Sequence, residues 1–184
     1  MKTDLRTYKV VRKQKSGDKC IVCGFDNDTS MKLQFYVLED NSICAIFNPS
    51  WKWCSYEGRL HGGIISTLLD ETIGRAIQFE NDELFGVTTD LRVKFLKPTP
   101  YDRELFIVGK IVSDIKRIVY GSGYICDSDG TIYAHASGKF LQLDVKKIAE
   151  VQLTNENWKH CPEHVVIKEF TLPDNSYLEK IEKV

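Results

Sequence analysis

The stretch that decides the fold begins with LHGGIISTLLDE at residues 60–71 and continues to about residue 81. Its hydrophobic positions recur at helical spacing and form one broad stripe over about five turns. The stretch therefore predicts one long helix that begins at His61-Gly62-Gly63 and fades near Asn81. The stripe comprises positions 60, 64, 65, 68, 69, 72, 73, 76 and 77.

Strand-like runs lie on both sides of this helix. Residues 32–39 and 43–47, joined by the turn-forming Glu-Asp-Asn-Ser segment, predict a hairpin before it. Four longer runs follow it, with a hairpin turn at residues 127–130; they are 86–95, 104–113, 117–127 and 131–143. A single helix among antiparallel hairpins predicts an α+β domain, with the helix packed on one face of an antiparallel sheet.

The composition indicates an ordinary globular domain. The chain has 184 residues, of which 42% are hydrophobic and 28% charged, and its formal net charge is −1. We therefore expect neither a nucleic-acid partner, which would need a basic surface, nor a membrane partner. No apolar run reaches the ~18 residues of a membrane span. Residues 1–15 lack the features of a signal peptide, so we expect a cytoplasmic location.

The pattern divides the chain into three parts. We expect residues 1–19, which are polar and rich in lysine, to form a loosely held lead-in. Residues 20–144 contain the strands and the long helix, and so form the domain itself. Residues 145–184 form a C-terminal extension with a short helix near its end and no clear partner in the pattern.

Two adjacent acids on the predicted helix fall on different flanks. At ~100° per residue, Asp70 shares one flank with three small residues, at positions 63, 66 and 74, which leave room for a ligand. Glu71 falls on the other, polar flank, four residues before Arg75, and this spacing predicts an ion pair. Asp70 is therefore the candidate catalytic carboxylate, with a surface carboxylate as the alternative interpretation.

The start of the predicted helix is a second candidate feature. Gly62 and Gly63 begin the helix, where free backbone N–H groups and a partial positive charge can stabilise an oxyanion. The alternative is an ordinary loop-to-helix turn. Gly62 and Asp70 are about 12 Å apart along a helix that rises ~1.5 Å per residue. One carbonyl cannot contact both, so a mechanism that uses both predicts a homodimer with two equivalent sites.

These residues carry a resemblance to a known family. The block Leu60–Glu71 resembles the signature of the PaaI-like and THEM-like branch of hotdog-fold thioesterases, which is HGG followed by an acid at the offset of Asp70. Residues 86–91 and 95–98 resemble the next strand of that family, and Cys20-Ile21-Val22-Cys23-Gly24 resembles an N-terminal CxxCG of many relatives. The resemblance covers about residues 20–143. It implies a hotdog fold, in which an antiparallel sheet wraps around one long helix and dimerises through sheet edges.

The resemblance also implies an activity. It indicates an acyl-CoA thioesterase that hydrolyses a thioester to CoA and a free acid, without a metal or other cofactor, since CoA is part of the substrate. Asp70 matches the nucleophile or general base and Gly62 the backbone oxyanion donor. His61 matches a histidine on the ligand side, to which we assign positioning, and Thr88 a hydroxyl that orients water. A carboxylate with an oxyanion hole suffices for an activated acyl group.

Several further residues are candidates for substrate binding. Gly63 lies at the start of the helix. Some relatives carry an asparagine before HGG, and this chain has Ser55, Tyr56 and Glu57 in that region. The candidates for the CoA phosphates are Arg92, Lys94 and Lys97 on the strand after the helix, and Lys139, with a solvated strand face as the alternative. The expected partner is a small-molecule acyl-CoA, and the expected assembly is a homodimer or a dimer of dimers.

Two other interpretations remain open. A protein of the same fold that binds acyl-CoA or another acyl ligand without catalysis is one of them, since fold does not determine function. A zinc site is the other, with Cys20 and Cys23 joined by Cys161 and His164, and with His160 nearby. We expect no metal and, without an export signal, six free thiols.

Overall fold

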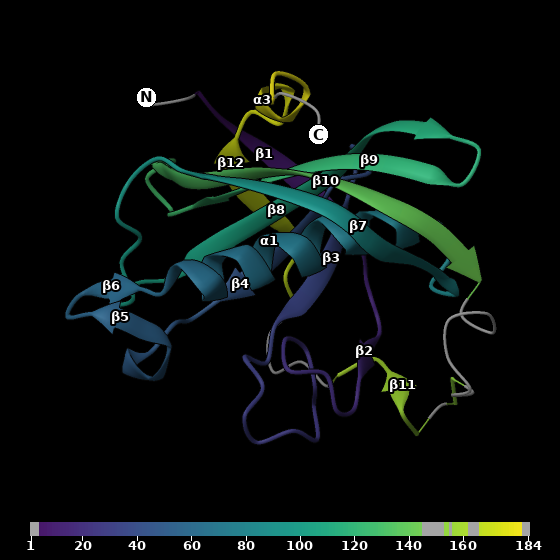
Figure 1. The fold of residues 1–184 in the computed structure, drawn as a ribbon, viewed down its shortest axis with the longest axis horizontal. Helices are drawn as coiled ribbons and strands as arrows, with labels where there is room; N and C mark the ends of the chain where they lie inside the picture. The colour runs from purple at the N-terminus through teal and green to yellow at the C-terminus, as the bar shows by residue number, and fades with distance from the viewer. Residues whose placement is uncertain (1–3, 145–152, 155, 162–165, 182–184) are drawn as a thin grey trace.

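The body of the molecule is a large antiparallel sheet. The computed structural model describes residues 4–144, 153–154, 156–161 and 166–181. The sheet strands are β1 (Leu5–Lys13), β3 (Gln34–Leu38), β4 (Ile43–Phe47), β7 (Leu84–Phe95), β8 (Leu105–Ile115), β9 (Ile118–Cys126), β10 (Ile132–Asp144) and β12 (Glu169–Pro173). Their order across the sheet is β12-β1-β3-β4-β8-β9-β10-β7, so β12 and β7 are the edge strands (Figure 1).

Smaller elements surround this sheet. Two short antiparallel pairs join β2 (Ser16–Gly17) to β11 (Trp158–Lys159) and β5 (Cys54–Tyr56) to β6 (Arg59–Leu60). Among the described residues, the helices are the long α1 (Gly62–Arg75), the short α3 (Ser176–Glu179), and two 3₁₀ turns, η1 (Trp51–Trp53) and η2 (Ala76–Gln78). No helix in the described part of the chain is long and apolar enough to cross a membrane.

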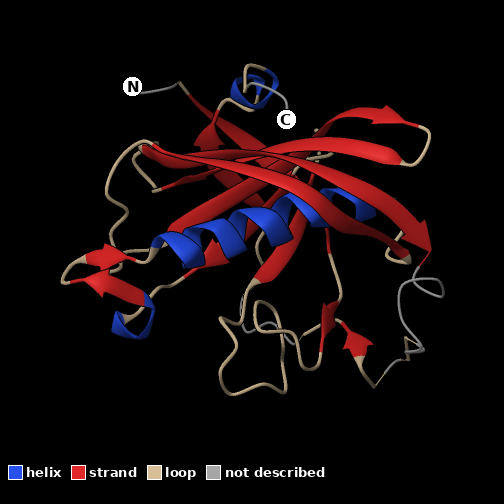
Figure 2. Ribbon diagram, in the orientation of Figure 1, coloured by secondary structure: helices blue, strands red, loops and turns tan. Residues whose placement is uncertain are grey.

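Helix α1 lies across one face of the sheet (Figure 2). The predicted stripe is the buried face, since Ile65, Leu68, Leu69 and Ile73 are almost fully buried in the core. The helix approaches the sheet closely over Gly109 of β8, where a Cβ atom would lie 2.6 Å from the carbonyl oxygen of Thr72. Only glycine avoids that overlap, so this position determines how near the helix can sit.

The opposite face of the sheet is covered by the C-terminal segment. β12 pairs with β1, and α3 packs near β8 and β9. Phe170, Leu172 and Leu178 join Tyr8 and Tyr124 in a second buried cluster on this side. Hydrogen bonds anchor the segment, with the Tyr124 hydroxyl donating to the Pro173 carbonyl at 3.0 Å. The central strands of the sheet are therefore buried on both faces, whereas the edge strand β7 is largely exposed.

The fold confirms the main sequence predictions and corrects one. The helix, the β3–β4 hairpin and the four long strands lie where they were predicted, and the α+β class is confirmed. The prediction of a loosely held lead-in is wrong for Leu5–Lys13, which is a nine-residue strand in the sheet. A register shift between Val10 and Arg12 interrupts the alternation by which a strand is recognised. The division into domain and extension stays a prediction.

Candidate active site

A cavity of about 270 Å³ lies between α1 and β7. Asp70 and Gly74 of the helix and Gly86 and Thr88 of the strand form part of its lining, together with Phe140 of β10. The structure thus brings together two residues predicted to act in catalysis, Asp70 and Thr88, which are eighteen positions apart in the sequence.

Asp70 and Thr88 are in direct contact. The Thr88 hydroxyl donates a hydrogen bond of 2.9 Å to Oδ1 of Asp70. Asp70 is half-buried, and no salt bridge to it is present among the described residues. Burial raises the pKa of Asp70 above its ordinary value; the Thr88 hydrogen bond opposes this shift and the nearby charge of Glu71 adds to it. A carboxylate without a cationic partner is a stronger base than one in an ion pair.

Small residues give access to this carboxylate. A Cβ atom on Gly74 would lie 3.5 Å from the Phe140 ring, and one on Gly86 would overlap Ile77. Of the three small residues predicted to flank Asp70, only Gly74 lines the cavity; Gly63 and Ser66 do not, and the Ser66 hydroxyl donates to the Gly62 carbonyl at 3.0 Å.

The start of α1 is shaped by His61. Its Nδ1 accepts a 2.9 Å hydrogen bond from the Gly63 N–H and thereby caps the helix. Within the described part of the chain, the Gly62 N–H has no hydrogen-bond partner. The ring of Phe95 lies beside Gly62, 3.5 Å from where a Cβ atom would be. One backbone donor is thus occupied by His61, and the adjacent one is available to a ligand.

A β-bulge in β7 separates the predicted phosphate-binding cations from the cavity. Thr88 pairs with Phe140 and Asp90 with Lys139, so Thr89 is an extra residue. Beyond the bulge, Leu91 and Val93 pack on the core beneath α1. Since side chains alternate along a strand, those of Arg92 and Lys94 project from the face opposite Asp70.

The other predicted substrate-binding residues lie near the start of α1 or after β7. Ser55 and Tyr56 belong to the β5–β6 hairpin that precedes the helix (Figure 1), and the Tyr56 side chain is 77% exposed. Lys97 follows β7, is exposed, and donates its backbone N–H to the Tyr133 carbonyl. The roles of these residues in substrate binding stay predictions.

Three residues of the cavity wall come from segments that the sequence analysis did not place at this site. Cys20 comes from the loop after β2, Phe85 from β7, and Trp158 from β11 in the C-terminal extension. The rings of Phe85 and Trp158 pack against each other with centroids 5.4 Å apart. No local pattern signals these contacts, because the residues come from segments far apart in the sequence.

The other flank of α1 contains the predicted ion pair. Nε of Arg75 lies 2.9 Å from Oε1 of Glu71, as its i,i+4 spacing predicted. Arg75 is only 5% exposed, however, where a solvated polar flank was expected. The rings of Phe35 and Trp158 stack on its guanidinium, with centroids 4.6 and 4.8 Å away. The N-terminal loop and β11 therefore cover a flank that sequence alone marks as polar.

Comparison with known proteins agrees with this geometry. A family model described as the thioesterase superfamily matches residues 57–134, from the turn before α1 into β10. Over these residues, which are less than half of its length, the chain is similar to the thioesterase superfamily. The antiparallel sheet around one long helix is the hotdog fold, as the resemblance implied.

Three similar proteins define the likeness. The acyl-coenzyme A thioesterase THEM5 of Mus musculus is 29% identical over 118 residues, which are 64% of this chain and 47% of that protein. A crystal structure of a thioesterase superfamily protein, RHA08564, is 26% identical with a TM-score of 0.62, covering 66% of this chain and 62% of that one.

The third is a hypothetical thioesterase protein of Streptococcus pneumoniae, crystallised with coenzyme A. It is 22% identical with a TM-score of 0.52, and the match covers 56% of this chain and 82% of that one. The match spans about half the length of the mouse protein and less than two thirds of RHA08564.

Proposed function

We propose that this protein is an acyl-CoA thioesterase in which Asp70 is the nucleophile or general base. The hydrogen bond between the Thr88 hydroxyl and Asp70, at the wall of a cavity, is the observation that carries the proposal. The names of similar proteins support the substrate class, since one is an acyl-coenzyme A thioesterase and another was crystallised with coenzyme A.

The chemistry needs only groups that this chain supplies. As a general base, Asp70 takes a proton from water while the hydroxide attacks the thioester carbonyl. The tetrahedral intermediate then expels the CoA thiolate, which takes up a proton, and a free carboxylic acid remains. As a nucleophile, Asp70 attacks the carbonyl directly, the C–S bond breaks and the CoA thiolate leaves and takes up a proton; water then cleaves the resulting anhydride to the free acid and restores Asp70. In both routes Thr88 holds the carboxylate in place, and neither route needs a metal.

The oxyanion donor is the Gly62 N–H of a second subunit. Gly62 and Asp70 are separated by about 12 Å along one helix, so a single chain cannot bring both to one carbonyl. β7 is a twelve-residue edge strand with exposed Val87 and Phe95 along it, and an edge of this kind favours pairing with another copy. A dimer through β7 brings the Gly62 of one subunit toward the Asp70 of the other.

Hydrolysis of a panel of acyl-CoAs, followed by release of free thiol, tests the activity. Asp70→Asn should lower the turnover of the preferred substrate at least ~100-fold. Asp114→Asn, which changes an exposed aspartate at the end of β8, is the matched control and should keep full activity. No turnover with any acyl group, while CoA still binds, would instead identify a non-catalytic acyl-CoA binding protein.

Mixing two inactive variants tests the shared site. Gly62→Pro removes the N–H at the first helical position, where proline is well tolerated, and the extended backbone of His61 suits a following proline. Gly62→Ala keeps the donor and is the control. Mixed Asp70→Asn and Gly62→Pro subunits should recover about a quarter of wild-type activity, because half the dimers would contain one intact site. No recovery after subunit exchange would exclude a site built from two subunits.

A further inference from the structure

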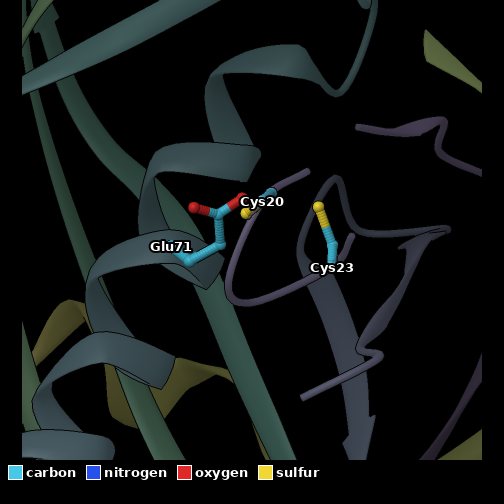
Figure 3. A group of neighbouring side chains, drawn as sticks. All are labelled: Cys20, Cys23 and Glu71. Carbon is cyan, nitrogen blue, oxygen red and sulfur yellow. The ribbon is translucent and has the colours of Figure 1, made fainter. Parts of the chain in front are cut away.

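A cluster of two thiols and a carboxylate lies beside the Asp70 cavity. The Sγ atoms of Cys20 and Cys23 and a carboxylate oxygen of Glu71 all lie within 4.8 Å of one another. In Figure 3 the Glu71 side chain leaves α1 toward the loop that carries both cysteines. Two segments about fifty residues apart thus meet at three atoms that can each bind a metal ion.

The loop is built to present both sulfur atoms to the helix. The Gly24 N–H donates to the Cys20 carbonyl at 2.8 Å and closes a turn around the two cysteines. The Val22 N–H donates to Sγ of Cys20 at 3.3 Å. A Cβ atom on Gly24 would overlap the Cys20 carbonyl, so only glycine permits this turn. Cys23 is buried and Cys20 half-buried, which holds both thiols in one orientation.

A buried cation contacts two members of the cluster and balances part of their negative charge. The Arg75 guanidinium lies 2.9 Å from Sγ of Cys23 through Nη2 and 2.9 Å from Glu71 through Nε. Nη1 of Arg75 also donates to the Lys15 carbonyl, so this cation is fixed in place. Two thiolates and one carboxylate carry three negative charges, and Arg75 balances one. A divalent cation would balance the other two and make the buried group neutral.

We propose that Cys20, Cys23 and Glu71 bind one Zn²⁺ ion. Two thiolates and a carboxylate are a donor set suited to zinc, whose tetrahedral sites place ligand atoms about 3.5 Å apart. The side chains need to close only slightly from their present separation. Arg75 then lies behind the ligands and donates to a thiolate and a carboxylate, as groups that orient metal ligands do.

The site has a structural consequence. Cys20 and Glu71 both line the cavity that contains Asp70. A shared ion would link the Cys20–Gly24 loop to α1 and fix that wall of the cavity. The zinc site does not depend on the thioesterase activity, and the hydrolysis proposed above includes no metal step.

The set of ligands differs from the one that the sequence suggested. His160 and Cys161 follow β11, and neither belongs to the cluster in the described part of the chain. His164 lies outside the described residues. Glu71, interpreted from sequence only as the partner of Arg75, is the third ligand.

Cobalt binding to the full chain tests the site. The protein is treated with a chelator, kept reduced with a phosphine, and titrated with Co²⁺ and then with Zn²⁺. We expect one Co²⁺ per chain, with the sulfur-to-cobalt charge-transfer band and the strong visible bands of a tetrahedral thiolate site, all abolished by Zn²⁺. Zn²⁺ should also raise the midpoint of thermal unfolding. A wild-type spectrum without the charge-transfer band overturns the proposal, whatever the variants do.

Three variants assign the ligands. Cys20→Ser should weaken metal affinity at least ~100-fold, and Glu71→Gln about 10- to 100-fold. Cys161→Ser, which changes a half-exposed thiol outside the cluster, should bind as the wild type does. Loss of binding in Cys161→Ser with retention in Cys20→Ser would overturn the ligand assignment. Because the test measures a metal spectrum and not hydrolysis, its outcome is independent of the thioesterase activity. A protein without activity can still show the zinc site, and a protein with activity can still lack it.

Discussion

Asp70 and Glu71 are neighbours in the sequence, yet their carboxylates lie in different electrostatic environments on the two flanks of α1. On the flank toward β7, Asp70 accepts a hydrogen bond from the neutral Thr88 hydroxyl and borders a cavity. On the flank toward the N-terminal loop, Glu71 is paired with the buried cation of Arg75. The comparison shows that one turn of helix can contain a carboxylate beside a neutral hydroxyl and another paired with a buried cation. The elements that pack on each flank determine which of the two environments a carboxylate has.

The largest difference between the flanks should come from Arg75→Ala. Removing the guanidinium leaves Glu71 and Cys23 without the cation that both contact, and it empties the space between two aromatic rings. We expect the free energy of unfolding to fall by about 3 to 5 kcal/mol. Urea denaturation measures this, with Arg59→Ala as an exposed control. If the free energy of unfolding falls no more than in Arg59→Ala, the charge of Arg75 does not stabilise this flank.

On the flank toward β7, Thr88→Val should change the pH dependence of kcat/KM. The Thr88 hydrogen bond lowers the pKa of Asp70, so losing it raises that pKa further. Because catalysis needs the deprotonated carboxylate, the acidic limb of the kcat/KM profile should move to higher pH. The plateau should also fall about 10-fold, the value of one hydrogen bond to a charged group. Thr89→Val, on the adjacent bulge, is the control. If the acidic limbs of the kcat/KM profiles of Thr88→Val and wild type overlap, Thr88 does not set the pKa of Asp70.

Glu71→Gln should have a smaller effect on stability than Arg75→Ala. The amide oxygen of glutamine can still accept the bond from Nε of Arg75, so only the charge is lost. We expect a loss of about 1 kcal/mol in the free energy of unfolding. Measured beside Arg75→Ala in metal-free buffer, an equal loss in the two variants would show that the cation acts only through Glu71.

The smallest effect should be a gain in stability from Asp70→Asn. The pKa of Asp70 is raised in the folded protein, so folding favours the protonated carboxyl and the charged form costs stability. The gain is absent at low pH, appears as the pH rises from the unfolded-state pKa through the raised folded-state pKa, and then stays constant. It should be on the order of 0.5 kcal/mol. Thermal unfolding across the acid range measures it, and a variant less stable than wild type at neutral pH would refute this account.

Local patterns predicted the part of the fold that depends on one element at a time. The stripe on α1 and the alternation of Leu33, Phe35 and Val37 each report which side of the segment faces the core. The same reasoning separated Asp70 from Glu71, because the helical projection alone distributes positions 70 and 71 to different flanks.

Contacts between distant segments could not be predicted in this way. Arg75 looks like a surface residue in its own helix and is buried only because the N-terminal loop and Trp158 cover it. The meeting of Cys20 and Cys23 with Glu71 has the same origin. The strand β12 was missed because it has only five residues, ends in Pro173, and is stabilised by its partner β1.

The pairing of β1 with β12 has a consequence for the order in which the molecule is made. Leu5 lies opposite Pro173, so β1 can pair with β12 only after the long intervening segment has been translated. Until then, β1 presents a bare edge, and Tyr36 and Tyr124 on the outer sheet face lack the cover that Phe170 and Leu178 provide. During synthesis, the outer face of the sheet therefore gains its hydrophobic cover only when β12 and α3 have been made.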